Sequence, residues 1–495
     1  MKHTVKLLVL AVGMALTALS TTQAASKPNI VHIVSDDLGW KDVGFNGATD
    51  IKTPHIDALA AGGAKFTQFY TQSMCTPTRA ALMTGRYPFR YGLQTIVIPG
   101  PAGYGLDTSE YLLPQCLKDA GYSTAIIGKW HLGHADIKYW PKQRGFDYQY
   151  GAMIGELDYY THSDAGVLDW FRNNQPVKEE GYTTQLIGND AVKYLNEQSA
   201  DKPFYLYLTF NAPHTPYQAP QDYIDRYKDI EEPTRRIYAG MVTCMDDEIG
   251  RVVATLEKKG MRENTLIIFH SDNGGTKNAM FAGQMTDLSK LKLPCDNGPY
   301  RDGKGSLFEG GSRVAACANW PGHIKPQTVD GIIHAVDLYP TLASLAGAST
   351  AKCKPLDGVN VWDTIAKGRN SPRTELVYNV EPFRGAVRQG DWKMIWRTLI
   401  PTSVDLYNLA DDPYEQNNVA SKHPLRIHSM QARLNELGKE SAKPLALMYV
   451  ASVGLAHGKP NMASPDGKKP AAEPVHGHSI TDEGVGEKDI HAEQK

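Results

Sequence analysis

The sequence has few cysteines, almost no net charge and, after its N-terminal segment, no long apolar run. Six cysteines in 495 residues are too few for a scaffold held together mainly by disulfides. A formal net charge of −2 excludes strong attraction of the whole protein to nucleic acid, although it allows a local basic pocket. No later stretch is long and apolar enough to cross a bilayer. These absences predict an ordinary globular protein with no nucleic-acid partner.

The N-terminal segment has the features of a secretory signal peptide. Lys2 and Lys6 supply positive charge, an apolar run covers residues 7–19, and small residues follow at 22–25. The run is shorter than the ~20 residues that span a bilayer, which disfavours the alternative of an uncleaved anchor helix. We therefore predict that residues 1–25 are removed and that the mature protein is exported, periplasmic or secreted, with no membrane attachment.

The cysteines other than Cys75 are odd in number, so they cannot all pair within the chain. They are Cys116, Cys244, Cys295, Cys317 and Cys353. At least one of them stays free or pairs outside the chain, and the sequence alone does not give the pairing.

Four short apolar runs are typical of buried strands in a mainly parallel sheet. They cover residues 29–34, 124–127, 203–210 and 265–269. Helical patterns lie between them, at 56–62, 113–120 and 238–258. Alternation of strands and helices predicts an α/β architecture.

Each of the four runs is followed at once by polar, charged or imidazole side chains. In open α/β sheets, ligands bind at the carboxyl ends of the strands. We therefore expect one edge of the sheet to gather side chains that are far apart in the sequence: Asp36, Asp37, Lys129, His131, His214, Asp272 and Asn273.

The C-terminal part follows a different pattern. A stretch rich in Lys, Pro, Gly and Asn near 350–380 suggests a boundary, which gives a large N-terminal domain over 26–370 and a smaller α+β subdomain over 371–457. Within the subdomain we expect a hairpin at 386–396, a third strand at 405–409 and a helix at 425–439. Residues 458–495 have few apolar side chains and are predicted to form a flexible polar tail.

Cys75 lies at the predicted start of a helix. Pro77 suits the first turn, Thr76 is a plausible N-cap, and Gly85 suits the C-terminal stop. Such an N-terminus favours an anion, and Arg79, four residues on, can fold back toward Cys75. On these grounds Cys75 has three interpretations: a small buried residue, a thiolate nucleophile or a side chain modified to an aldehyde.

The segment Cys75-Thr-Pro-Thr-Arg79, followed by Thr-Gly-Arg, resembles the signature of type I sulfatases. Other motifs of that family occur in order: Ser-Asp-Asp-Leu-Gly at 35–39, Gly-Lys-Trp-His-Leu-Gly at 128–133, Ala-Pro-His at 212–214, Ser-Asp-Asn-Gly at 271–274 and Gly-Lys-Gly-Ser-Leu-Phe-Glu-Gly-Gly at 303–311. Within the family, Thr-Pro-His-Ile-Asp at 53–57 and Asp-Tyr-Tyr-Thr-His at 158–162 are similar to the arylsulfatase B (N-acetylgalactosamine-4-sulfatase) group, which includes bacterial polysaccharide sulfatases.

The resemblance covers roughly residues 28–420 and implies an alkaline-phosphatase-like fold. That fold has a large mixed, mostly parallel sheet sandwiched by helices, with a smaller C-terminal α+β subdomain containing an antiparallel sheet. The resemblance also implies that Cys75 becomes formylglycine through a formylglycine-generating maturation enzyme, which favours the modified-cysteine interpretation.

By the same resemblance, a calcium ion is held by Asp36, Asp37, Asp272, Asn273 and the modified Cys75. An all-oxygen donor set suits a hard cation such as Ca²⁺ better than zinc. Turn chemistry is the alternative explanation for each acidic pair on its own, because Asp and Asn are common where strands end.

The resemblance further implies catalytic roles for Cys75, Arg79, Lys129, His131, His214 and Lys304. The formylglycine hydrate would attack sulfur. Arg79, Lys129 and Lys304 would hold the sulfate oxygens, His131 would take a proton as sulfate leaves, and His214 would protonate the leaving oxygen. Taken singly, a lysine is usually a solvated surface residue and a histidine is more often structural, so these residues gain their catalytic interpretation together, from one family pattern.

The substrate is expected to be a sulfated oligosaccharide or polysaccharide, with a galactose- or N-acetylgalactosamine-type 4-sulfate of carrageenan or chondroitin/dermatan type. Asp158, Tyr160, His162 and Arg301 are candidate substrate-binding residues, although core packing explains each of them as well. Two alternatives stay open: a phosphonate or phosphodiester hydrolase of the same superfamily, and an unmodified glycan-binding protein.

Overall fold

The structure is a computed structural model, and it describes residues 27–277, 293–398 and 402–457. The predicted signal peptide (1–25) and the predicted tail (458–495) lie outside the described residues. Within the described ranges, no helix is both long and apolar enough to cross a membrane.

The four apolar runs form the centre of a ten-stranded sheet, as predicted. β1 (Asn29–Ser35) pairs in parallel with β10 (Phe204–Thr209) on one side and β11 (Thr265–Ser271) on the other, and β4 (Ser123–Gly128) pairs in parallel with β10. Every residue of β1, β10 and β11 is buried, which explains why these strands read as continuous apolar runs.

The remaining strands of this sheet are short and include antiparallel pairs. The full order is β13 (Gln327–Val329), β2 (Ala64–Phe66), β12 (Ala316–Asn319), β11, β1, β10, β4, β5 (Tyr148–Gly151), β8 (Phe171–Arg172) and β9 (Gln175–Pro176). Two two-stranded ribbons accompany it, β3 (Phe69–Tyr70) with β14 (Ile333–His334) and β6 (Ser163–Asp164) with β7 (Val167–Leu168). The sheet is thus mixed and mostly parallel at its centre.

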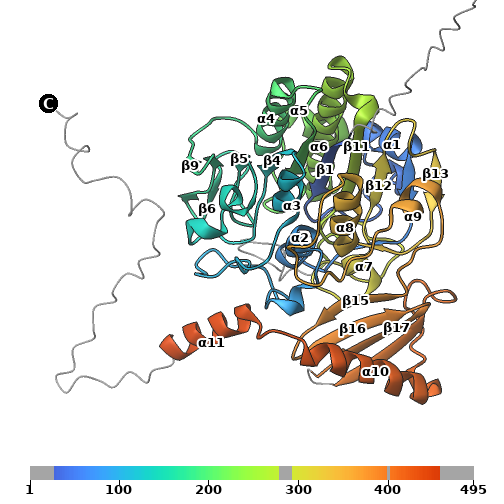
Figure 1. Cartoon of the computed structure of the whole chain (residues 1–495). Helices are drawn as coiled ribbons and strands as arrows, with labels where there is room; N and C mark the ends of the chain where they lie inside the picture. The colour runs from blue at the N-terminus through green and yellow to red at the C-terminus, as the bar shows by residue number, and fades with distance from the viewer. Residues whose placement is uncertain (1–26, 278–292, 399–401, 458–495) are drawn as a thin grey trace, which may run out of the picture.

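Helices cover both faces of this sheet (Figure 1). Ile30 and Val34 of β1 pack into one apolar cluster, with α2 (Cys75–Thr84), α3 (Leu113–Asp119) and α8 (Ala335–Leu345). Val31 and Ile33 point into the other, with α1 (Pro54–Ala61), α4 (Thr183–Glu197) and α6 (Pro233–Lys258). The alternation along one strand shows why the sheet needs cover on both sides.

Shorter helices complete this part of the molecule: α5 (Gln221–Ile224), α7 (Glu309–Ser312) and α9 (Trp362–Lys367). The helices predicted at 56–62, 113–120 and 238–258 correspond to α1, α3 and α6. Helix α6 begins earlier than predicted because Glu232 caps it, accepting a hydrogen bond from the Arg235 amide, and Pro233 suits its first turn.

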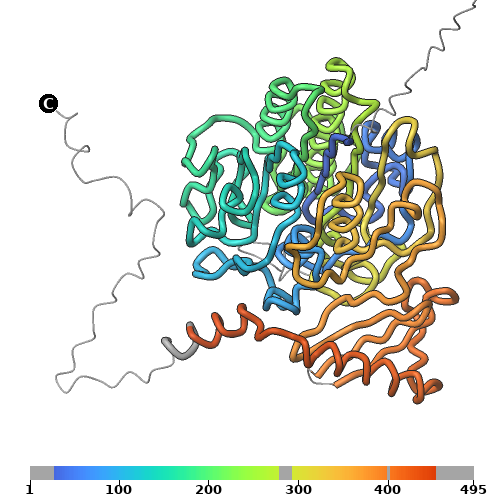
Figure 2. Tube along the Cα trace, viewed as in Figure 1, coloured from blue at the N-terminus to red at the C-terminus, as the bar shows by residue number. Residues whose placement is uncertain are grey.

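A separate four-stranded antiparallel sheet forms the C-terminal region, which lies below the large sheet in the view of Figure 2. Its strands are β15 (Glu375–Val380), β16 (Arg384–Gln389), β17 (Trp392–Arg397) and β18 (Ser403–Asn408). The predicted hairpin is β16–β17, whose turn has Gly390 at φ 56°, and the predicted third strand is β18. β15, which the sequence did not suggest, pairs with β16.

Helix α10 (Pro424–Lys439) covers one face of the small sheet by burying Met430, Leu434 and Leu437, and α11 (Leu445–His457) follows it. Between the two sheets, Lys393 is fully buried and donates to Glu309 at 2.9 Å and pairs with Glu415 at 2.8 Å. This buried ion triad joins β17 to α7, which lies close to the carboxyl edge of the large sheet.

Candidate active site

The carboxyl ends of the four central strands meet at one edge, as predicted. Backbone hydrogen bonds continue beyond the strands: the Asp36 amide donates to the Ala212 carbonyl at 3.1 Å, and the Asp272 amide donates to Ser35 at 3.0 Å. Gly128 ends β4 at φ 113°, and a Cβ there would lie 1.7 Å from the Thr209 carbonyl oxygen. Only glycine allows this close approach, which brings the next residue, Lys129, into the site.

Helix α2 supplies Cys75, and all ten of its residues are buried. The predicted N-cap was wrong by two positions: Met74 is the N-cap, without a side-chain cap, and Cys75 is the first helical residue. Thr76 instead links two loops, donating to the His131 carbonyl and accepting from the Ile98 amide, each at 3.1 Å. The predicted stop at Gly85 is confirmed, since this residue has φ 66°.

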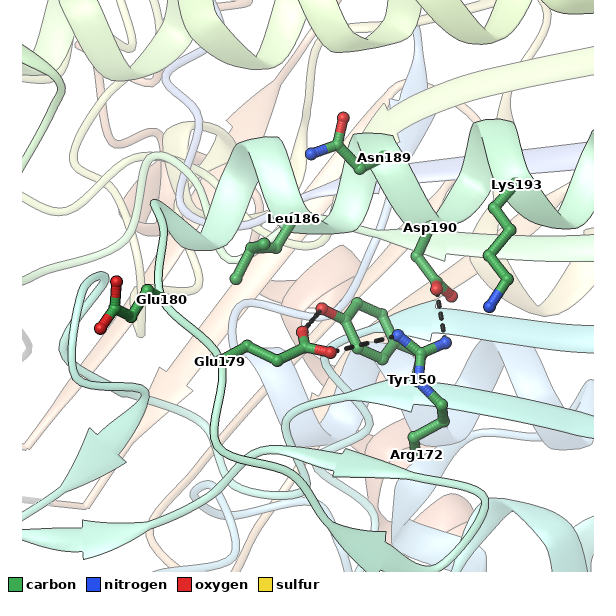
Figure 3. A pocket seen from close by; sticks show the side chains of 8 residues that line it. All are labelled: Tyr150, Arg172, Glu179, Glu180, Leu186, Asn189, Asp190 and Lys193. Atoms are coloured by element: carbon green, nitrogen blue, oxygen red, sulfur yellow. Dashed lines mark hydrogen bonds and ion pairs between the residues drawn. The ribbon is translucent and has the colours of Figure 1, made fainter.

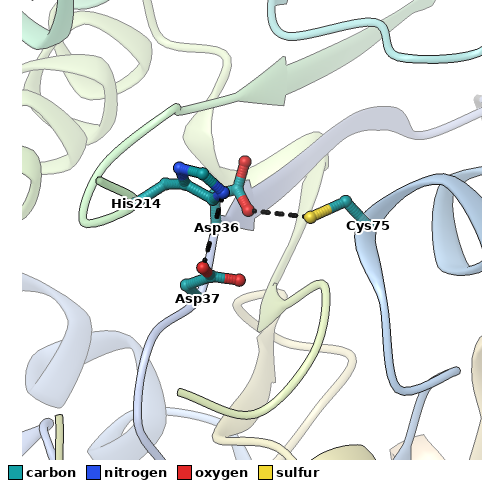
Figure 4. A group of neighbouring side chains, drawn as sticks. All are labelled: Asp36, Asp37, Cys75 and His214. Carbon is teal, nitrogen blue, oxygen red and sulfur yellow. Dashed lines mark hydrogen bonds and ion pairs between the residues drawn. The ribbon is translucent and has the colours of Figure 1, made fainter. Parts of the chain in front are cut away.

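The predicted metal ligands come together around Cys75. The Cys75 thiol donates to Asp36 at 3.3 Å, and ligand atoms of Asp36, Asp37, Cys75 and His214 all lie within 4.8 Å of one another (Figure 4). Asp272 and Asn273 are connected to this group by hydrogen bonds with Asp37. Asn273 donates from Nδ2 to the Asp37 carboxylate at 2.7 Å, and the Asp37 amide donates to Asp272 Oδ1 at 3.3 Å.

Three buried cations surround these carboxylates. Arg79 donates to Asp272 at 2.8 Å and approaches Asp36 at 3.4 Å, Lys129 pairs with Asp36, and Lys304 donates to Asp37 at 2.8 Å. The hydrogen bonds of Arg79 go to these carboxylates and to the Lys129 carbonyl rather than to Cys75. Arg79 therefore positions the acidic residues.

The charges of this cluster balance without any metal, because three carboxylates face three cations. A bound divalent cation would raise the formal charge to about +2 and so favour an anionic ligand beside Cys75. The cations alone would not create this preference, since each is already paired with a carboxylate.

The donor set fits a hard divalent cation. It consists of buried carboxylate and amide oxygens, which calcium prefers. Asn273 Oδ1 is buried, and within the described residues it has no hydrogen-bond partner, although Nδ2 of the same amide donates to Asp37 and to the Gly274 carbonyl. A buried acceptor of this kind needs a partner, and a cation held by the neighbouring carboxylates would provide one.

The carboxylates differ in how easily they ionise. Burial opposes ionisation of Asp36, yet Lys129, His214 and Arg79 together hold its pKa well below the ordinary value. Asp37 behaves similarly, because Lys304 and His214 outweigh burial and lower its pKa. For Asp272, burial and the charge of Asp36 raise the pKa to about 7.

The thiol of Cys75 is held protonated. Burial and the nearby carboxylates of Asp272 and Asp36 raise its pKa well above the ordinary value. A thiolate nucleophile needs the opposite environment, with a lowered pKa. The thiolate interpretation therefore loses its physical basis, and the unmodified side chain is a poor nucleophile.

Two histidines line the cavity together with Cys75. Burial and the charges of Lys129 and Arg79 lower the pKa of His131, so this ring is neutral at neutral pH. Its Nε2 lies 3.2 Å from the Ile98 carbonyl, and its buried Nδ1 has no hydrogen-bond partner in the described part of the chain. Since Nε2 carries the proton that the carbonyl accepts, Nδ1 is left with a lone pair that can take up another proton.

His214 is held between its own loop and the acidic cluster. Nδ1 lies 2.7 Å from the Thr215 carbonyl and must carry a proton to donate to it. Nε2 lies 3.0 Å from the Lys304 ammonium and 3.5 Å from Asp37. In the neutral ring Nε2 accepts from Lys304. Its Nε2 therefore faces both an ammonium donor and a carboxylate.

A cavity of ≈ 260 Å³ opens above Cys75. Its lining includes His131, His214 and Lys304, together with residues 97–100, Ile154, Gly155, Glu156 and Asp164. Sequence reasoning missed the residues at 97–100 and 154–156 because they lie in irregular segments with no motif to mark them, and Asp164 because it lies on a strand of only two residues.

The four predicted substrate-binding residues do not line this cavity. Asp158 accepts a hydrogen bond from the Tyr160 amide at 3.0 Å, which closes a local turn. Its other carboxylate oxygen accepts from the Gln218 side chain. Tyr160 is 45% exposed, and His162 is buried against Trp170 with its Nε2 near the Gly181 carbonyl.

Arg301 stacks on Phe308 and donates to the Glu415 carbonyl at 3.0 Å, toward the C-terminal sheet. The Tyr160 ring lies against the Tyr182 ring, with centroids 5.4 Å apart, so each of these four side chains has a structural contact.

A larger cavity of ≈ 450 Å³ lies elsewhere, beside β5 and α4 (Figure 3). Arg172 crosses it and pairs with Asp190 at 2.5 Å and with Glu179 at 3.5 Å, while stacking on Tyr150. Its lining combines Arg172 and Lys193 with Glu179, Glu180 and Asp190 and contains no cysteine or histidine, so it offers no counterpart to Cys75.

Comparison with known proteins identifies the family. The model of the sulfatase family matches residues 28–348. Arylsulfatase J of Mus musculus is 33% identical over 474 residues, covering 84% of this chain and 77% of that protein. N-acetylgalactosamine-6-sulfatase of Homo sapiens is 30% identical, covering 88% of this chain and 84% of that protein.

Among solved structures, Ps i-CgsB in complex with k-i-k-neocarrahexaose is similar with a TM-score of 0.75 and 33% identity, covering 84% of this chain and 94% of that chain. The sheet order, the cluster at its carboxyl edge and these matches over most of the chain lead to one conclusion: the protein belongs to the sulfatase family, within the alkaline-phosphatase-like superfamily.

Proposed function

We propose that the protein removes sulfate from a sulfated glycan, using formylglycine made from Cys75. The observation that carries this proposal is the position of Cys75. It lines the cavity together with Lys304, and it donates at 3.3 Å to Asp36, which belongs to the buried cluster of three carboxylates and three cations. The thiol itself is held protonated, so modification would turn an inert side chain into a reactive one.

The proposed metal is Ca²⁺, held by Asp36, Asp37, Asp272, Asn273 and residue 75. When bound, it would supply positive charge next to the attacking oxygen and the sulfate group. The oxygen donors and the unpartnered Asn273 Oδ1 support this assignment. Lys129 and Lys304 are paired with these carboxylates. Once the cation neutralises the carboxylates, both ammonium groups could donate hydrogen bonds to sulfate oxygens.

Formylglycine, as its hydrate, would supply one hydroxyl to attack sulfur and a second whose deprotonation lets sulfate leave as the aldehyde re-forms. Asp272, whose pKa is raised to about 7, is placed to take a proton near residue 75. The neutral His131 offers Nδ1 as an acceptor for the second proton. His214, beside Lys304 and Asp37, is the candidate donor to the leaving oxygen.

The glycan proposed is a galactose- or N-acetylgalactosamine-type sugar with a 4-sulfate, in a carrageenan or chondroitin/dermatan type of chain. The names of similar proteins support a sulfated glycan, since they include N-acetylgalactosamine-6-sulfatases of several mammals and a protein solved with a neocarrahexaose. The 4-position rests on the motif resemblance alone. The predicted signal peptide supports export, to the periplasm or outside the cell, where such polymers are met. We further propose that residues 26–370 and 371–457 form the catalytic domain and its subdomain.

The direct test compares Cys75→Ala with the wild-type protein on aryl sulfate, aryl phosphate and phosphonate esters. We expect the variant to lose sulfate-ester turnover while melting at a similar temperature. Cys353→Ala is the control, because this half-buried thiol lies outside the cavity.

Retained activity in the Cys75→Ala variant would contradict the nucleophile assignment. A wild-type preference for phosphate or phosphonate esters would favour the hydrolase alternative, and inactivity on every ester together with glycan binding would favour the non-catalytic one.

A further inference from the structure

The segment that carries Lys304 is held by three backbone contacts. The Lys304 amide donates to the Gly275 carbonyl at 3.1 Å, and the Gly305 amide donates to the Ser73 carbonyl at 2.7 Å. The Gly305 carbonyl accepts from Arg384 Nη1 at 2.6 Å. Because Arg384 is the first residue of β16, this last contact joins the Lys304 segment to the C-terminal sheet.

Arg384 is fixed in turn by Glu381. Arg384 Nε donates to Glu381 Oε1 at 3.1 Å, and Nη2 lies 3.0 Å from the same oxygen. The Glu381 side chain is 3% exposed, so this carboxylate depends on its cation. The planar guanidinium thereby contacts the carboxylate and the Gly305 carbonyl at the same time, which a lysine ammonium on a flexible stem does not reproduce.

The same turn contacts a second segment that leads into the cavity. Asn379 donates from Nδ2 both to Glu381 and to the Gln94 carbonyl, the latter at 2.7 Å. Gln94 shortly precedes residues 97–100, which line the cavity. The register of β15 against β16 shifts between Val377 and Asn379, a bulge of the kind that redirects side chains beside functional sites. The turn between β15 and β16 is therefore built to hold neighbouring loops.

Other contacts of the C-terminal sheet hold the far end of the segment at 303–311. Lys393 of β17 donates to Glu309 at 2.9 Å, and the Glu309 amide donates to Glu415 at 2.7 Å. These contacts anchor the segment at α7, whereas Arg384 contacts it at the residue after Lys304. Arg384 is thus the better placed of the two cations to set where Lys304 lies.

The position of the Lys304 ammonium matters because its partners lie close to it. Nζ is 2.8 Å from Asp37 and 3.0 Å from His214 Nε2. A contact that holds the Gly305 carbonyl also limits movement of the adjoining Lys304 backbone. Displacement of a group in an active site by about 1 Å can lower the rate about 10²-fold.

Resting on the proposed function, we infer that Arg384 is a positioning residue for Lys304. Glu381 holds the guanidinium, and the guanidinium holds the Gly305 carbonyl, so the C-terminal sheet sets where the Lys304 ammonium lies relative to the sulfate group. The sheet would then contribute to the rate of the reaction, although Arg384 itself does not line the cavity.

The test is a double-mutant cycle of Arg384→Met and Lys304→Met, measured on an aryl sulfate. We expect Arg384→Met alone to lower kcat by about 10- to 10²-fold and to leave KM within about twofold, because Lys304 acts on the transition state. In the Lys304→Met background the same change should cost less than about threefold, since no ammonium is left to position. Equal losses in both backgrounds would overturn the inference, because a residue that only stabilises the fold acts independently of Lys304.

Arg433→Met is the matched control. Arg433 of α10 forms a comparable ion pair with Glu375 of β15 at 2.9 Å, in the same C-terminal region, and it does not line the cavity. We expect this variant to keep wild-type kcat at a temperature where it is folded. A loss of kcat as large as that of Arg384→Met would count against a specific role for Arg384.

If Arg384→Met does not fold, Arg384→Lys takes its place in the cycle. It keeps a charge beside Glu381 but lacks the fork that also reaches Gly305. A loss of kcat that disappears in the Lys304→Met background supports the inference, and wild-type kcat, or equal losses in both backgrounds, overturns it. If the wild-type protein hydrolyses no sulfate ester, the proposed function fails instead, so the two failures are distinguishable.

Discussion

Replacing Lys304 by methionine should abolish most of the catalytic rate while leaving the fold and the metal site intact. Lys304 Nζ lies 2.8 Å from Asp37 and 3.0 Å from His214 Nε2, and its side chain is 4% exposed. Methionine keeps most of the length and apolar surface of the lysine stem. Asp37 retains hydrogen bonds from Asn273 and Thr276, so this carboxylate is not left alone.

The size of the effect follows from the charge that is lost. One positive charge about 4 Å from a developing oxyanion contributes roughly 4 kcal/mol at an effective dielectric constant near 20. Removal of a single oxyanion donor in other enzymes lowers kcat about 10²- to 10³-fold. We therefore expect kcat for an aryl sulfate to fall by about 10²- to 10³-fold.

The assay combines steady-state kinetics, a thermal melt and elemental analysis of bound metal. Lys352→Met is the control, because Lys352 is 65% exposed on the surface and loses the same charge. Bound metal should stay close to wild type in both variants. The melting temperature should stay unchanged for Lys352→Met and fall for Lys304→Met, because Asp37 loses a buried cation, but the variant should remain folded at the assay temperature. If the Lys304→Met variant keeps kcat within about threefold of wild type, then Lys304 does not stabilise the transition state.

Three further predictions follow from other parts of the structure. Lys393→Met leaves the buried Glu309 and Glu415 without their shared cation, so the free energy of unfolding should fall by about 3–5 kcal/mol in a denaturant titration; an unchanged value would refute this. Burial raises the pKa of Asp169 to about 7, so the folded protein keeps a proton that the unfolded chain loses near pH 4. Stability should therefore fall as the pH rises from about 4 to 7. Asp169→Asn should flatten that part of the profile of melting temperature against pH, and parallel profiles for the variant and the wild-type protein would contradict this. Removal of calcium by a chelator should abolish sulfate-ester turnover, and its return should restore it; full activity with metal absence verified would count against the site.

The sequence predicted the centre of the fold because burial on both faces leaves a simple pattern. β1, β10 and β11 are wholly buried, so each appears as an uninterrupted apolar run followed by the polar residues of the site. The parallel register then brings Asp36 and Asp272 together without any further information. The edge strands of two to four residues, such as β8 and β9, carry too few side chains to produce a pattern.

Local detail at Cys75 was harder to predict. Thr76 has the residue type of an N-cap, but its hydroxyl instead links the Ile98 and His131 loops, a contact between residues distant in the sequence. Part of the cavity lining was missed for a related reason: residues 97–100 and 154–156 are irregular, β6 has only two residues, and their approach to Cys75 depends on tertiary packing. Asp158 and His162 were predicted to bind substrate because aromatic side chains beside them can stack on sugars; this stays a prediction, and in the structure Asp158 accepts from a local amide while His162 packs on Trp170.

The most direct test of the central claim is a mass spectrum of the peptide that contains residue 75, taken from active protein produced together with a formylglycine-generating enzyme. Conversion of the thiol to an aldehyde exchanges sulfur and two hydrogens for one oxygen, so the account predicts a peptide about 18 Da lighter than the encoded sequence. An unmodified cysteine in fully active protein would contradict it.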